Sequence, residues 1–247
     1  MRNILSGRVW LRVKNDGGTS GSSPTQQNCR QQIVIFVLPR SQFGTIDAID
    51  PQDASFTLPA MSDRVESMKN THFDILKHEL VNVPSEWFFD PHGIHGIGHT
   101  QRVYHHAKRL SEALSLTEDA KEPLLLAALW HDIGRKDDSV DPNHGQLSVM
   151  KVKALDLHRM YSQEMLELTF LAIEYHSKDD SIGELACLSA SNPHLARTIL
   201  SALKDADALD RVRIGCLKPA YLRFPWTHTQ IDYAKSFFES FHAMRSI

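Results

Sequence analysis

The sequence predicts an all-α protein: a bundle of about seven helices that begins near residue 63 and follows an N-terminal extension. Apolar residues after residue 63 recur at spacings of three and four, as they do on one face of a helix. Capping residues, proline and glycine fall at the ends of these periodic segments. The sequence contains no internal repeat, no glycine-rich phosphate loop and no dinucleotide-binding fingerprint. We therefore divide the chain into an extension, 1–60, and a helical domain, 61–247.

The first 60 residues differ in composition from the rest of the chain. Residues 14–32 are rich in Gly, Ser, Gln and Asn and carry too little apolar surface to form a core. Residues 33–38, IVIFVL, are typical of a short strand that ends at Pro39. We predict a loosely ordered extension, with Met61 as an alternative start of the chain. A small, weakly β appendage is the competing interpretation.

The first helix of the bundle that carries a candidate functional residue follows the loop DPHGIHGIG. Apolar residues recur along the inward face of this helix at i, i+4, i+7 and i+11: Val103, Ala107, Leu110 and Leu114. This spacing predicts an amphipathic helix that ends near residue 116. His99 lies four residues before Val103 and is therefore predicted to share this inward face.

The next predicted helix, 124–133, begins with the apolar run LLLAALW. A helix that is apolar on all sides is buried by its neighbours. Pro123 suits a first helical turn, and Gly134 is predicted to close the helix. The adjacent His131 and Asp132 are thus expected at the end of a buried helix.

Two helices are predicted between residues 144 and 176. The first opens at His144, and its inward face is predicted to consist of Leu147, Met150 and Ala154. The second is capped by Ser162, and its buried stripe is predicted to consist of Met165, Leu168, Ala172 and Tyr175. His176 lies four residues after Ala172 and continues this stripe.

The C-terminal part of the bundle contains two further predicted helices. Pro193 begins the first, in which Leu200, Leu203 and Asp207 share a face at i, i+3 and i+7. The segment IDYAKSFFESFHAM predicts a final amphipathic helix. The segments 177–193 and 213–228 are predicted as loops.

Composition and charge exclude several classes of protein. Charged residues make up 23% and hydrophobic residues 42% of the chain, and the formal net charge of −3 indicates no general attraction to nucleic acid or anionic membranes. The three cysteines include no CxxC motif, which argues against a disulfide framework or a thiolate zinc site. No apolar run approaches the ~20 residues that cross a bilayer, and no secretion signal is present. We expect a cytoplasmic enzyme or binding protein.

Ionisable side chains recur on the inward faces of the predicted helices. They are His99, the pair His131–Asp132, His144, His176 and Asp207. Buried carboxylates pair with other groups or bind a metal, and the helices of a bundle can direct such groups to one point. Imidazole nitrogen with carboxylate oxygen suits Zn, Mn, Fe, Ni or Co rather than Ca. Each residue alone also has a structural interpretation: a core histidine, a hydrogen-bonded helix end or, for Asp207, an ion pair with Arg211.

The order of these residues resembles the H…HD…D pattern of the HD-domain superfamily of metal-dependent phosphohydrolases. HGIGHTQRV (95–103) is similar to the HGxxHxxRV form, LWHDIGR carries the HD pair, and ADALD (206–210) is similar to ADRLD. The resemblance covers about residues 90–215 and implies an HD-domain-like helical bundle. It also implies four metal ligands: His99, His131, Asp132 and Asp207. His144 and His176 resemble the two histidines that two-metal members add; otherwise they are a loop residue and a phosphate contact.

The resemblance further implies a function. It predicts a metal-dependent phosphohydrolase that cleaves a phosphomonoester or phosphodiester of a nucleotide or related small molecule by metal-activated water. One or two divalent ions are expected, of Mn, Fe, Mg, Co, Ni or Zn. Asp132 is placed to orient the water. Arg135 follows the helix end and is placed to meet the substrate anion, or else only interacts with the helix dipole. His95 is a candidate general acid or hydrogen-bond partner of a ligand, or else a loop residue.

Two other functions fit the same residues. A two-iron HD-type oxygenase would use the same six ligands, and a non-catalytic HD-fold binding module would have lost at least one. Arg102 and Asp210 are each predicted to be members of structural ion pairs, whereas His105 and His106 are predicted to cap a helix or face solvent. The expected partner is a small phosphorylated substrate, with no nucleic acid or membrane partner, and the oligomeric state is left open.

Overall fold

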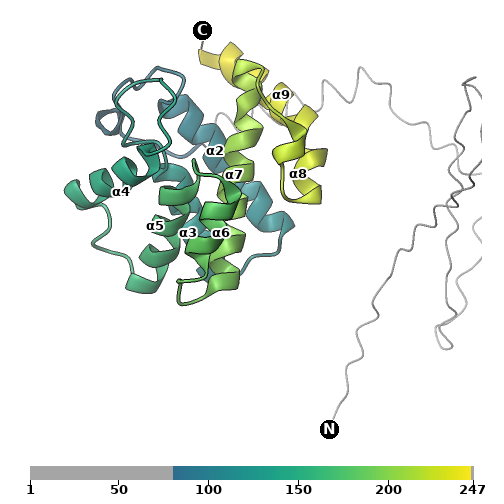
Figure 1. Ribbon diagram of the computed structural model, residues 1–247. Helices are drawn as coiled ribbons and strands as arrows, with labels where there is room; N and C mark the ends of the chain where they lie inside the picture. Colours follow the sequence, from purple (N-terminus) through teal and green to yellow (C-terminus); the bar gives the residue numbers. More distant parts are fainter. Residues whose placement is uncertain (1–79, 246–247) are drawn as a thin grey trace, which may run out of the picture. The chain divides into compact units, whose positions relative to one another are not determined.

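The computed structural model describes residues 80–245. Within this range the chain forms eight α-helices and three short 3-10 helices, without a β-strand (Figure 1). The predicted all-α class is therefore confirmed, with one helix more than the predicted number of about seven. The predicted extension, its strand at 33–38 and the start of the helical domain at 61 lie outside the described residues. No helix within residues 80–245 is both long enough and apolar enough to cross a membrane.

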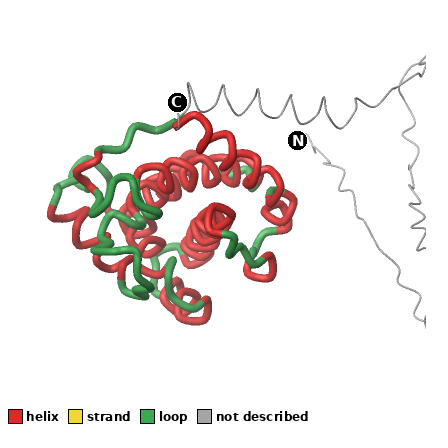
Figure 2. The backbone as a smooth tube through the Cα atoms, turned by 90° about the horizontal axis from the view of Figure 1, so that it is seen from above, coloured by secondary structure: helices red, strands yellow, loops and turns green. Residues whose placement is uncertain are grey.

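Four long helices form the core of the bundle: α2 (Ile97–Ala113), α3 (Glu118–Trp130), α5 (Gln163–Tyr175) and α7 (Pro193–Asp210). The predicted burial of α3 on all sides is confirmed, because α3 contacts each of the other three and Leu124 and Ala127 are fully buried. Seen from above, one helix stands end-on inside a ring formed by the others (Figure 2). Apolar burial among these helices is the main stabilising contribution to the fold.

The remaining α-helices are shorter or lie at the C-terminal end of the described range: α4 (His144–Ala154), α6 (Asp180–Cys187), α8 (Pro225–Thr229) and α9 (Ile231–Arg245). The 3-10 helices are η1 (Ser85–Trp87), η2 (Arg211–Ile214) and η3 (Pro219–Tyr221). The prediction of loops at 177–193 and 213–228 is wrong where these segments contain α6 and α8. The helix α6 is stabilised by packing, because its Gly183 and Cys187 are buried and α6 contacts α5 and α7.

The boundaries of α3 differ from the prediction at both ends. The helix starts after Thr117, which is extended, and its first turn carries the acidic residues Glu118 and Asp119. Acidic side chains at a helix N-terminus interact favourably with the helix dipole, which explains the early start. Pro123 consequently lies inside the helix rather than in its first turn, and His131 is the C-terminal cap.

The buried faces of α4 and α5 were predicted with different success. On α4, the predicted face is wrong at Met150 and Ala154, which are exposed, while Leu147 is partly buried; Ser148 and Val152 are buried instead. The reason is that the first turn of α4 lies against two other helix ends, which sets its rotation. On α5 the Ser162 cap is confirmed, since its Oγ accepts a hydrogen bond from the backbone N of Met165 at 3.2 Å. The predicted stripe of α5 is buried at Leu168 and Ala172 and partly buried at Met165 and Tyr175.

Candidate metal centre

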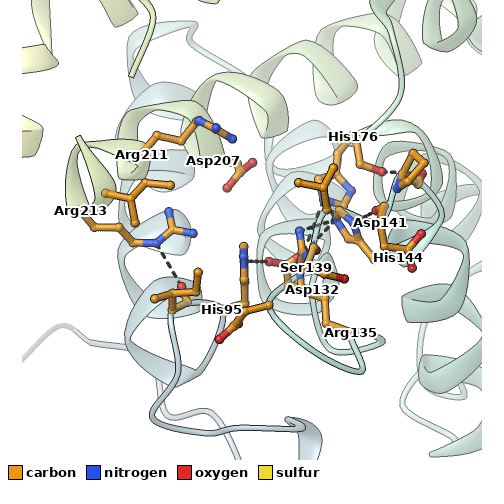
Figure 3. A pocket seen from close by; sticks show the side chains of 16 residues that line it. His95, Asp132, Arg135, Ser139, Asp141, His144, His176, Asp207, Arg211 and Arg213 are labelled. Atoms are coloured by element: carbon orange, nitrogen blue, oxygen red, sulfur yellow. Dashed lines mark hydrogen bonds and ion pairs between the residues drawn. The ribbon is translucent and has the colours of Figure 1, made fainter. Parts of the chain in front are cut away.

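The six predicted ligands lie at five helix ends that meet in one region. His99 is in the first turn of α2, His131 caps α3 and Asp132 follows it, His144 begins α4, His176 caps α5, and Asp207 is in the last turn of α7. Four of them surround the cavity in Figure 3, namely Asp132, His144, His176 and Asp207. The residues therefore come from separate helices, but their side chains share one site.

Two glycines allow the start of α4 to reach this region. A Cβ atom on Gly134 would lie 2.1 Å from the backbone N of Ser148, and a Cβ on Gly145 would lie 2.2 Å from the carbonyl O of Ile173. The backbone N of Gly134 also donates to Ser148 Oγ at 2.9 Å. The predicted role of Gly134 as the residue that closes α3 is wrong, because α3 ends earlier and Gly134 is not left-handed. These close approaches place His144 beside the ends of α3 and α5.

The two carboxylate oxygens of Asp132 face different pairs of histidines. Oδ2 lies 3.4 Å from His99 Nε2 and 3.7 Å from His131 Nε2. Oδ1 lies 3.0 Å from His144 Nε2 and 3.7 Å from His176 Nε2. Burial alone would raise the pKa of Asp132, but the histidines that face its carboxylate (His131, His144 and His176) hold that pKa well below its ordinary value. Asp132 thus remains ionised at the centre of the cluster.

Asp207 completes the cluster from α7. Its Oδ1 lies 3.4 Å from His99 Nε2, and its side chain is 28% exposed. Ligand atoms of His99, His131 and Asp207 lie within 4.8 Å of one another, as a single ion requires. Within the described range, no ion pair joins Asp207 to Arg211, so this structural interpretation of Asp207 does not hold.

The four histidines all present Nε2 to the centre, because each Nδ1 is held by an oxygen. Three of these Nδ1 atoms donate to backbone carbonyl oxygens: His131 to Ala128 O at 2.9 Å, His176 to Ile173 O at 2.7 Å, and His144 to Asp141 O. The fourth, Nδ1 of His99, donates to Asp210 Oδ2 at 2.7 Å. Carbonyl and carboxylate oxygens only accept hydrogen bonds, so Nδ1 carries the proton. In each neutral ring, Nε2 therefore carries a lone pair.

These Nε2 atoms approach one another in pairs. His99 and His131 are 3.1 Å apart, and His144 and His176 are 2.8 Å apart, measured between Nε2 atoms. Burial lowers the pKa of His131 to about 3, so this ring is neutral near pH 7. Lone pairs at such distances repel unless a cation or a proton lies between them. Asp132 Oδ1 also accepts no hydrogen bond from the part of the chain that the structure describes. The donor set therefore fits a divalent cation.

Asp210 is a functional residue that the sequence assigned only to an ion pair. Both residues are in an ion pair, as predicted, and the structure shows that it joins them to each other: Arg102 Nε and Nη2 donate to the two oxygens of Asp210 at 2.6 and 3.1 Å. Asp210 also accepts a hydrogen bond from Nδ1 of His99. Burial alone would raise the pKa of Asp210, but the hydrogen bond from His99 and the charge of Arg102 hold it below its ordinary value. Burial and the charge of Arg213 lower the pKa of His99, but Asp132 and Asp210 together raise it by more, so the pKa of His99 lies above its ordinary value. Such a partner orients a metal-binding histidine.

The other two predicted catalytic residues both contact Asp132. His95 Nδ1 lies 2.8 Å from Asp132 Oδ2, and burial, the largest effect, lowers the pKa of His95 although Asp132 raises it. Arg135 Nε lies 3.0 Å from Asp132 Oδ1, and Arg135 Nη1 donates to Ser139 O at 3.1 Å. The structure thus brings both residues to the cluster, with Arg135 contacting the protein itself.

The prediction that His105 and His106 cap a helix or face solvent is wrong. Both are buried, because α9 covers this side of α2. His105 Nε2 lies 2.7 Å from the Tyr233 hydroxyl, and the His105 ring stacks on Phe237 with 4.4 Å between centroids. Burial lowers the pKa of His106 to about 4. These histidines therefore belong to the packing between α2 and α9.

A cavity of about 400 Å³ opens beside the cluster. Four candidate ligands and His95 line it, and three arginines also contribute to its wall: Arg135, Arg211 and Arg213 (Figure 3). A cavity of this size suits a small ligand. Cationic side chains around it favour an anionic one.

The fold and the site together define a helical-bundle protein whose helix ends gather histidines and aspartates that can hold a metal. A comparison with protein families agrees with this class, since the family model for the HD domain matches residues 96–213. The matched span contains α2 to α7 and all six candidate ligands. Residues 96–213 thus match the HD domain, which is consistent with the HD-domain superfamily that the sequence motifs predicted. In the comparisons with curated proteins and with solved structures, nothing matched.

Proposed function

We propose that this protein is a metal-dependent phosphohydrolase that cleaves a phosphomonoester or phosphodiester of a nucleotide or related small molecule. The observation that carries the proposal is the meeting of histidine Nε2 lone pairs and two carboxylates beside a cavity lined with arginines. The match to the HD domain, which is the domain of a superfamily of metal-dependent phosphohydrolases, supports the same reaction class. The cavity volume of about 400 Å³ supports a small phosphorylated substrate.

The candidate ligands divide into two sets that share Asp132. His99, His131, Asp132 Oδ2 and Asp207 would hold one divalent ion, and His144 and His176 with Asp132 Oδ1 would hold a second. Nitrogen with carboxylate oxygen suits Mn, Fe, Co, Ni or Zn, and carboxylates also accept Mg. Bound here, such an ion would lower the pKa of a water molecule toward about 7 and neutralise charge on the phosphoryl oxygens.

The chain's own residues would position the reactants. Asp132 would orient the attacking water by accepting a hydrogen bond from it. Because His95 donates its Nδ1 proton to Asp132, its Nε2 can accept a proton and later return it to the leaving oxygen. Arg135 would hold the Asp132 carboxylate in place and add positive charge at the cavity wall. We further propose a cytoplasmic location, which accords with the two free cysteines of the described residues, Cys187 and Cys216.

The test combines metal analysis with phosphate release. The purified protein is loaded with each candidate ion and assayed on p-nitrophenyl phosphate, its bis-ester and a panel of nucleotides and sugar phosphates. Asp132→Ala should abolish both bound metal and hydrolysis while preserving helical circular dichroism. Asp232→Ala, at a residue that is 93% exposed on α9, is the control and should behave like the wild type. Unchanged hydrolysis in Asp132→Ala would overturn the proposal. Two bound irons with oxygen consumption and no phosphate release would indicate the oxygenase instead.

A further inference from the structure

Two of the three cavity arginines are engaged by the protein itself. The guanidinium of Arg135 contacts Asp132 Oδ1 at 3.0 Å through Nε. Arg213 Nε donates to the carbonyl O of Ile94 at 3.0 Å, and its Nη1 lies 3.2 Å from Asp210 Oδ2. These contacts hold the loop before α2 and the carboxylates of the cluster. Neither guanidinium is therefore left with its full set of donors for a ligand.

Arg211 lines the same cavity, but its guanidinium has no hydrogen bond or ion pair with any residue in the described range 80–245. The side chain is exposed, and Arg211 directly follows the last residue of α7. It lies four residues after Asp207, and residues at this spacing lie on the same side of a helix. In Figure 3 the Arg211 side chain, at the start of η2, and the Asp207 side chain, in the last turn of α7, lie near each other at the cavity that Asp132 and His176 also line. A free cationic fork thus stands next to a candidate metal ligand.

A purely structural role for Arg211 would be an interaction with the C-terminal end of the α7 dipole. Such an interaction contributes to the stability of the helix alone and has no dependence on a ligand. It does not explain why the guanidinium faces the cavity that the candidate ligands line. The two roles differ in what the loss of Arg211 changes: stability in one case and anion binding in the other.

We propose that Arg211 binds non-bridging oxygens of the substrate phosphate and thereby selects phosphomonoesters over phosphodiesters. The inference rests on the proposed function of this site. A guanidinium fork donates to two oxygens at once, and the metal centre takes at least one more. A phosphomonoester has three non-bridging oxygens, enough for the guanidinium and the metal centre together, whereas a diester has only two. The diester must therefore give up part of one interaction.

Calorimetry tests the binding directly, with inorganic phosphate as the probe and the manganese-loaded protein as the receptor. Arg211→Gln should weaken phosphate binding by about 10- to 100-fold, which is the usual effect of losing hydrogen bonds to a charged group. Manganese binding and thermal unfolding should change little. Arg197→Gln removes an exposed arginine of the same helix that does not line the cavity, and should bind phosphate as the wild type does. Wild-type phosphate affinity in Arg211→Gln, or an equal loss in Arg197→Gln, would overturn the proposal.

Selectivity is measured with dimethyl phosphate, which has two non-bridging oxygens and is not consumed. The wild type should bind inorganic phosphate more tightly than dimethyl phosphate, and Arg211→Gln should reduce that ratio by about tenfold. Arg211→Lys should restore only part of the ratio, because an ammonium is a point charge without a fork. An unchanged ratio in Arg211→Gln would refute the selection of monoesters. A wild type that binds phosphate through Arg211 but hydrolyses no ester would refute the proposed function and leave this inference standing.

Discussion

The substitution Asp210→Asn tests whether a buried carboxylate orients His99 for metal binding. Asp210 is fully buried and accepts hydrogen bonds from His99 Nδ1 at 2.7 Å and from Arg102 Nε at 2.6 Å, while Arg213 Nη1 lies 3.2 Å away. Asparagine keeps the shape of the side chain but removes its charge and replaces one acceptor oxygen with a donor. At least one of these three donors must then face another donor.

The magnitude follows from the burial of these partners. Removing one member of a buried ion pair costs about 3–5 kcal/mol, and the Arg102 side chain is only 7% exposed, so we expect a loss in this range in the free energy of unfolding. Loss of the outer partner of a metal-binding histidine lowers metal affinity by about 10- to 100-fold. Because the pKa of Asp210 is lowered in the folded protein, its stabilising contribution is present above about pH 4 and is lost as the pH falls through the folded value.

The two effects are measured separately. Urea unfolding of the metal-free protein, followed by circular dichroism, gives the free energy of unfolding, and calorimetry gives the manganese affinity of the folded protein. Asp205→Asn is the matched control, because Asp205 is also fully buried on α7 but accepts from the backbone N atoms of Arg223 and Phe224. It should lose stability without losing metal affinity. Wild-type manganese affinity in Asp210→Asn, or an equal loss of affinity in Asp205→Asn, would refute the reasoning.

Three further expectations concern stability and domain organisation. Burial lowers the pKa of His106 from 6.5 to about 4, so the folded protein favours the neutral ring. The contribution of this neutral ring to the free energy of unfolding is fully present when the pH is above the pKa of His106 in the unfolded chain. The free energy of unfolding should fall by roughly 3 kcal/mol as the pH drops from 6.5 to 4, and urea titrations of His106→Leu should lack that part of the slope. Gly145→Ala places a Cβ 2.2 Å from a backbone oxygen and should lower the free energy of unfolding by about 3 kcal/mol or more. Gly183→Ala places its Cβ against a flexible leucine side chain and should lower it by less in the same unfolding assay. Equal losses in the two variants would contradict this expectation. Deletion of residues 1–60 should leave metal-dependent phosphate release near that of the full chain, and an insoluble or inactive product would show that these residues are integral to the fold.

The helical fold could be predicted largely from local patterns, and the errors have identifiable physical causes. Ser162 and Pro193 mark helix starts because capping and proline geometry depend only on neighbouring residues. Met150 was placed on the wrong face because the rotation of α4 depends on its contact with α5 at Gly145. His105 was expected at the surface because α9, which covers it, lies more than a hundred residues later in the chain.

In the candidate site, too, some residues could be recognised from neighbouring residues, and others only from contacts between distant segments. His99 and Asp207 could be found from the sequence because each lies on a helical face that apolar neighbours define. The importance of Asp210 could not be found in this way, since it depends on a contact with His99 across 111 residues. Its spacing was the available signal: Asp210 follows Asp207 by three residues, and Arg102 follows His99 by three. These spacings indicate that α2 and α7 are tied together at the site.

The sequence by itself determined the all-α class, the order of the main helices and the ionisable residues at their inward ends. These properties depend on residues within one or two helical turns of each other, where periodicity and capping act. Only the tertiary structure decided which oxygen of Asp132 faces which histidines, and that Arg135 contacts Asp132 whereas the guanidinium of Arg211 contacts no partner within residues 80–245. Those properties arise where separate helix ends meet, and they depend on packing between segments that are distant in the chain.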